Sequence, residues 1–79
     1  MRPTLRQLEY IVTIHQIGSF GLAAERLNVS QPSLSAQVAT VEAELNVRLF
    51  KRGRTGATTT AKGLEFVNRA RKILSDVEN

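Results

Sequence analysis

The sequence predicts a mostly α-helical domain in which three short helices are followed by a small β-hairpin and one long final helix. Apolar residues recur at the three- and four-residue spacing of a helix before residue 46 and again after residue 60. Between these segments, β-branched residues surround a turn with two glycines, a pattern typical of two paired strands. The chain has 79 residues, which suffices for one modest core and not for two.

The first predicted helix begins at Pro3-Thr4 and extends to about Ile17, where Gly18 provides a C-terminal stop. Its apolar-leaning face consists of Leu5, Leu8, Ile11, Val12 and His15. Because the chain has a single histidine and it lies on this face, we expect a structural imidazole and not a catalytic one.

A short helix and a tight turn are predicted next. Ser19 is a preferred N-cap for this helix, and Ala23 and Ala24 give it a small face that permits close packing. Asn28 tolerates the left-handed conformation that ends a helix, and Ser30 can cap the helix that follows. Two helices joined by about three residues have the layout of a helix-turn-helix, whose second helix enters the DNA major groove.

The third predicted helix runs from about Gln31 to Leu45 and ends at Asn46, with Pro32 tolerated in its first turn. An apolar stripe faces the core and consists of Leu34, Val38, Val41 and Leu45. Outside this stripe lie Gln31, Ser33, Ser35, Ala36, Gln37 and Thr40. Gln, Ser and Thr both donate and accept, so this face can meet base edges and phosphates. The alternative is an ordinary solvated helix face.

A basic hairpin, or wing, is predicted after the third helix. Val47, Leu49 and Phe50 favour a strand, residues 53–56 a turn, and residues 58–60 a returning strand. The stretch between Glu44 and Glu65 contains no acidic residue and five basic ones, Arg48, Lys51, Arg52, Arg54 and Lys62. With a net charge of +4, this favours a polyanionic partner, although a solubilising face is the alternative.

The final helix is expected to begin after Thr60 and to carry an apolar series longer than a three-helix core can cover. The series consists of Leu64, Val67, Ala70, Leu74 and Val77. An uncovered stripe predicts a homodimer through this helix, while the alternative is that the helix folds back on its own domain. We therefore expect a winged helix-turn-helix over residues 1–60 and a linker and dimerisation helix over residues 61–79.

Several function classes are disfavoured by composition. The chain has no cysteine, no apolar run as long as a membrane span and no signal-peptide pattern, so a cytoplasmic protein without a membrane partner is expected. It has no phosphate-binding glycine loop, no metal-ligand cluster and no nucleophile beside a base, so neither an enzyme nor a cofactor is expected. Compared with an enzyme, a helical protein-interaction module is a stronger alternative to DNA binding. RNA binding is a weaker alternative, because the chain has few aromatic residues on which bases could stack.

A family resemblance covers nearly the whole chain. It rests on Leu5-Arg6-Gln7-Leu8, Gly18-Ser19-Phe20, Ala23-Ala24-Glu25-Arg26-Leu27, Ser30-Gln31-Pro32-Ser33-Leu34-Ser35, Gln37, Val41-Glu42, Leu45, Arg48-Leu49-Phe50, Arg52, Thr60 and Gly63. In combination these residues resemble the DNA-binding half of the LysR-type bacterial transcriptional regulators. The resemblance implies a recognition helix in the major groove, a wing on the flanking minor groove and backbone, and a dimer on an interrupted palindrome of double-stranded DNA.

By position, the resemblance also implies which residues meet DNA. Recognition-helix contacts fall on Gln31, Pro32, Ser33, Ser35 and Gln37, and the wing contact on Arg52. The polar face adds Thr40, and Arg54 can replace the wing arginine that is common where this chain has Thr55. Ala36 stands where many members carry arginine, so we expect fewer base contacts and more readout of DNA shape.

The family's chains continue into a separate ligand-sensing domain, which is absent here. The chain is therefore expected to be the DNA-binding portion of a bacterial, nucleoid-associated regulator, in which a small-molecule co-inducer acts only through that missing domain. Asn46 in place of the usual Gly, and Lys62 in place of a usual Ala or Pro-Glu-type residue, do not argue against the fold.

Overall fold

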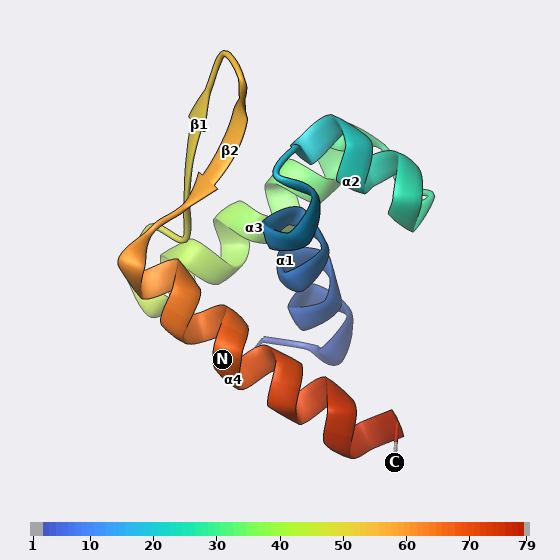
Figure 1. Cartoon of the computed structure of the whole chain (residues 1–79), viewed down its shortest axis with the longest axis vertical. Helices are drawn as coiled ribbons and strands as arrows, with labels where there is room; N and C mark the ends of the chain where they lie inside the picture. The colour runs from blue at the N-terminus through green and yellow to red at the C-terminus, as the bar shows by residue number, and fades with distance from the viewer. Residues whose placement is uncertain (1–2, 79) are drawn as a thin grey trace.

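The predicted order of elements is confirmed in the computed structural model, which describes residues 3–78 (Figure 1). The described elements are α1 (Leu5–Ile17), α2 (Phe20–Leu27), α3 (Gln31–Leu45), β1 (Phe50–Gly53), β2 (Gly56–Thr59) and α4 (Ala61–Glu78). Together they form a winged helix-turn-helix followed by a long helix.

The boundaries of the first three helices are set by local caps. The N-cap hydroxyls of Thr4, Ser19 and Ser30 each accept a hydrogen bond from the backbone of the first turn. Each helix then ends at a left-handed residue, with φ of 77° at Gly18, 59° at Asn28 and 55° at Asn46. These are the residues that the sequence predicts, because capping depends only on near neighbours.

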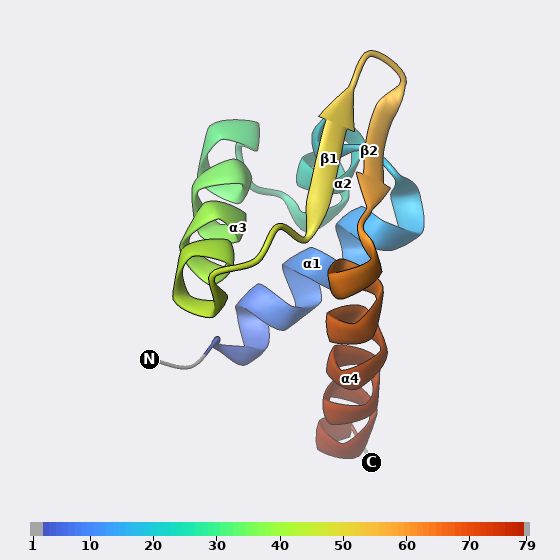
Figure 2. The same cartoon turned by 90° about the vertical axis from the view of Figure 1, so that its left-hand side faces the viewer.

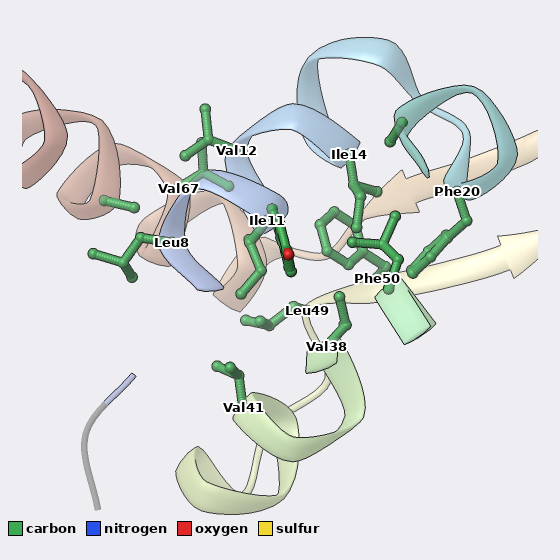
Figure 3. Packing of buried hydrophobic residues seen from close by; sticks show 14 of the residues in the cluster. Leu8, Ile11, Val12, Ile14, Phe20, Val38, Val41, Leu49, Phe50 and Val67 are labelled. Carbon is green, nitrogen blue, oxygen red and sulfur yellow. The ribbon is translucent and has the colours of Figure 1, made fainter. Parts of the chain in front are cut away.

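Helix α1 is the centre of the core. It lies between α3 and α4 in Figure 2 and also packs against α2 and β2. Its buried residues, several of which are labelled in Figure 3, are Leu8, Tyr10, Ile11, Val12 and Ile14. The predicted apolar face was therefore too narrow and partly misplaced: Leu5 is exposed and His15 only half-buried. A helix covered on several sides buries a wider arc than a single stripe.

The wing is bonded to the end of α1. Its strands pair antiparallel from Phe50 opposite Thr59 to Gly53 opposite Gly56. The Ala57 amide donates to the Gly18 carbonyl at 2.9 Å, and Nδ1 of His15 lies 2.7 Å from the hydroxyl oxygen of Thr59. His15 thus has a structural partner in the wing.

Two residues expected to favour a strand lie outside β1. Val47 and Leu49 belong to the segment that connects α3 to the wing, and the Leu49 side chain is fully buried. The burial of Leu49 explains why an apolar residue occupies this position outside a strand. The short strand β1 therefore begins only at Phe50.

Helix α4 corrects the expectation that its apolar series has no partner within the chain. Val67 and Ala70 are fully buried, and α4 packs along α1, so neither side chain has surface to offer a second copy. Leu74 is half-buried against the same core, while Leu64 and Val77 are exposed. Helical periodicity correctly identified an apolar face, but part of that face is covered by α1.

The close packing of α2 yields the first prediction. Replacing Ala23, which is fully buried, by Leu should overpack the core and lower the free energy of unfolding by about 1 to 3 kcal/mol. Ala39→Leu on the exposed side of α3 is the control and should leave the thermal midpoint nearly unchanged. Equal midpoints for the wild type and Ala23→Leu would contradict the packing described here.

Candidate functional site

The first half of α3 presents a polar face, as the sequence predicts. The side chains of Gln31, Pro32, Ser33, Gln37 and Thr40 are exposed, and Ser35 is half-buried. On the other side of the helix, the predicted stripe residues Leu34, Val38 and Val41 are buried and fix the rotation of α3 against the core. Leu45, the last residue predicted for this stripe, is exposed. The polar residues therefore occupy the accessible sides of α3 around this stripe, and Ser35 and Gln37, at about 100° per residue, lie about 160° apart around the helix axis.

The chain reverses direction after α3, and Glu42 holds this reversal. Its Oε2 accepts hydrogen bonds from the Leu49 amide at 2.7 Å and the Phe50 amide at 3.4 Å, and lies 3.7 Å from Nε of Arg48. Asn46, in the left-handed region, permits the turn. As a result, β1 runs back beside α3 toward its N-terminal end (Figure 2).

This return brings Arg52 of the wing onto the polar face of α3. Its Nη2 donates to Oγ of Ser35 at 3.0 Å, and its guanidinium carbon lies 3.6 Å from the centroid of the Phe20 ring. Phe20 in turn contacts Phe50 edge to face, with ring centroids 5.7 Å apart. An arginine stacked on an aromatic face is oriented as well as attracted, so Arg52 is held at the boundary between wing and helix.

The other basic residues of the wing segment do not form one patch. Arg54, in the loop between the strands, lines with Arg52 and Gln31 a shallow hollow between the wing and the start of α2. Arg48 instead pairs with Glu42, and Lys62 lies 4.0 Å from Glu65 on α4. Of the five basic residues, Arg52 and Arg54 therefore line this hollow beside Gln31, while Lys51 is exposed on β1.

Two residues in this site were not predicted as part of it. Phe20, on whose ring Arg52 stacks, is part of the family motif, but the sequence predicts no role for it in the site. Gln7 of α1 donates from Nε2 to Oε1 of Gln37 at 2.9 Å, although 30 positions separate them. Neither contact produces a local sequence pattern, because each joins different helices or strands.

A second candidate surface lies along α4. A mainly apolar groove is lined by Pro3, Leu8, Leu45, Phe66, Ala70 and Ile73, together with the charged residue Arg69. At about 100° per residue, Phe66, Ile73 and Val77 lie within about 40° of one another on α4, whereas Leu64 lies on the roughly opposite side. Of the predicted interface residues, Leu74 and Val77 line a separate hollow further along α4, against Leu5 and Glu9 of α1, and Leu64 lines neither hollow.

Comparison with known proteins gives the chain a family. Residues 5–64 match the model for the bacterial regulatory helix-turn-helix protein, lysR family. The chain is 39% identical over 74 residues to the transcriptional regulator TfdT of Cupriavidus pinatubonensis, covering 94% of this chain and 32% of TfdT. It is 48% identical over 73 residues to the nitrogen assimilation regulatory protein nac of Escherichia coli, covering 92% and 24%.

Solved structures agree with this assignment. A CbnR DBD–DNA complex superposes with a TM-score of 0.91 at 39% identity, covering 95% of this chain and 86% of that one. Oxidised OxyR of Corynebacterium glutamicum has a TM-score of 0.94 at 38% identity, covering 99% of this chain and 24% of that chain. The chain spans about a third or less of the curated relatives named above. Within that length, this chain belongs to the lysR family of bacterial regulatory helix-turn-helix proteins.

Proposed function

We propose that this chain binds a double-stranded DNA operator and thereby regulates transcription, with α3 in the major groove and the wing on the flanking minor groove and backbone. The observation that carries the proposal is the hydrogen bond from Arg52 to Ser35, which joins a wing cation to the polar face of α3. Two similar structures, of CbnR and BenM DNA-binding domains, are DNA complexes and support it.

Two kinds of contact contribute to this binding. Amide and hydroxyl groups of Gln31, Ser33, Ser35, Gln37 and Thr40 suit base edges, and Pro32 adds an apolar surface at the start of the helix. Arg52 and Arg54 neutralise phosphates and release counterions, which provides sequence-independent affinity. The net charge of +4 favours the same partner.

The binding unit in this proposal is a homodimer. Residues 61–78 supply the pairing helix, and the interface is centred on Ile73 in the groove against Leu45 and on Val77 further along α4. This revises the predicted interface, because Val67 and Ala70 are in the core of one copy. Two-fold pairing presents two recognition helices to a palindrome.

The remaining parts of the proposal concern the whole regulator. The relatives are named transcriptional regulators, so we assign this chain a binding role in the bacterial cytoplasm, without catalysis or a cofactor. A small-molecule co-inducer would act through sequence outside these 79 residues. None of the helices within residues 3–78 is long and apolar enough to cross a membrane.

The Arg52–Ser35 contact predicts coupling between wing and recognition helix. Ser35→Ala and Arg52→Ala should each weaken binding to a selected operator by about 1 to 3 kcal/mol. The double variant should lose less than the sum of the two losses, because each single change already breaks the shared hydrogen bond. Strictly additive losses in a binding titration would show that the two residues act separately.

Arg54 tests the electrostatic part of the proposal. Arg54→Ala should weaken binding to operator and random duplex alike and reduce the slope of log K against log salt by about one, as loss of one phosphate contact requires. Arg48→Ala is the matched control, because Arg48 is paired with Glu42. Binding of the wild type that does not depend on salt would favour a protein-interaction module instead.

The dimer interface has a matched pair of variants on one helix. Ile73 and Leu64 are 44% and 47% exposed, but only Ile73 adjoins the groove. Ile73→Asp should shift the protein to monomer in sedimentation equilibrium and weaken binding to a palindrome more than to a half-site. Leu64→Asp should remain dimeric. A wild-type monomer at tens of micromolar, or dissociation by both variants alike, would contradict this interface.

A further inference from the structure

We infer that Gln7 is a positioning residue that fixes the orientation of the Gln37 side-chain amide, so that Gln37 offers its N–H donors to bound DNA. The inference rests on the proposed DNA-binding function and extends it to a residue of α1 outside the recognition helix. It predicts the kind of chemical group that Gln37 can contact on a DNA duplex. Three hydrogen bonds carry it.

The first two bonds fix the Gln7 amide. The Thr4 backbone N–H donates to Oε1 of Gln7 at 2.9 Å, and the Gln7 backbone N–H donates to Oγ1 of Thr4 at 3.1 Å. This reciprocal pair is a capping box at the start of α1. A backbone N–H can only donate, so the amide oxygen of Gln7 must face Thr4 and its nitrogen must face away.

The third bond transfers this orientation to the recognition helix. Nε2 of Gln7 lies 2.9 Å from Gln37, and because Nε2 is a donor, the atom that it meets must be the oxygen Oε1. Nε2 of Gln37 is then the opposite end of the amide. It makes no hydrogen bond to any group of residues 3–78, and the Gln37 side chain is exposed.

A glutamine held in this way has a restricted choice of partner. An unrestrained glutamine can read adenine with both ends, donating to N7 and accepting from the N6 amino group. Gln7 occupies one of the two lone pairs of Oε1 and holds that oxygen toward α1, while both N–H groups of Gln37 are free of partners within residues 3–78. Gln37 therefore favours hydrogen-bond acceptors: a phosphate oxygen, or an acceptor on a base edge such as guanine O6 or N7. Holding the side chain before binding also reduces the conformational entropy lost on association.

Gln7→Glu tests the orientation without removing the cap. Glutamate at this position of a capping box still accepts from the Thr4 N–H, so the start of α1 should be preserved. A carboxylate cannot donate to Oε1 of Gln37, so the Gln37 amide should turn, donate from Nε2 to Glu and present its oxygen to the duplex. An unchanged thermal midpoint would verify that the fold is intact.

The readout is selection from a random duplex library, followed by titration of the selected site. If Gln37 contacts a base, Gln7→Glu should change the preferred base at one position of each half-site. If Gln37 contacts a phosphate, preference should stay the same and affinity should fall about threefold to tenfold, the equivalent of one hydrogen bond. Either result supports the inference, and the difference between them shows whether the acceptor that Gln37 contacts belongs to a base or to a phosphate.

The added charge of Glu is controlled by repeating the titration in a Gln37→Ala background. An effect transmitted through Gln37 should disappear there, whereas simple repulsion between the carboxylate and DNA should persist undiminished. Persistence, or a Gln7→Glu protein with wild-type preference and affinity, would overturn the inference. A wild-type protein that selects no duplex at all would instead overturn the proposed function.

Discussion

The carboxylate of Glu42 is the constraint on which the surface formed by α3 and the wing depends. Here Oε2 of Glu42 accepts from two successive backbone amides and sends the chain back along α3. A carboxylate that accepts backbone N–H bonds forms stronger contacts than a neutral acceptor, which suits a reversal with little other secondary structure. The start of the wing is consequently held by α3, while its second strand is bonded to the end of α1 through Ala57 and Thr59.

In this arrangement the polar residues of α3 and the basic residues of the wing are not two separate surfaces. Residue type alone predicts that the amides and hydroxyls of α3 provide specificity and the guanidinium groups of the wing provide affinity for a duplex. Arg52 belongs to both groups, because it is hydrogen-bonded to Ser35 and stacked on Phe20. A guanidinium held between three elements loses little freedom when it meets a ligand. Its position relative to the polar side chains of α3 is therefore set in the free protein.

The helix boundaries could be predicted from the sequence because each depends on a cap and its near neighbours. Thr4, Ser19 and Ser30 begin helices, and Gly18, Asn28 and Asn46 end them, as expected from their chemistry. The contacts that assemble the site could not be predicted in this way, because they join residues 17 or 30 positions apart. Helical periodicity identifies the apolar side of α4 but not the element that packs on it. For this reason the sequence predicts Val67 in an interface with a second copy, whereas Val67 is buried in the core where α4 packs on α1.

The junction between the wing and α4 has a mechanical consequence. The Thr60 hydroxyl donates to the Arg48 carbonyl at 2.6 Å and accepts from the Gly63 amide at 2.9 Å, which ties the base of the wing to the first turn of α4. A Cβ on Gly63 would meet the Leu49 carbonyl, so the two segments are in direct backbone contact. No spacer separates the two segments, and from this junction α4 continues along α1, with Val67 and Ala70 buried between them and the core. Because α4 is held both at this junction and along α1, it cannot turn relative to the wing without breaking these contacts.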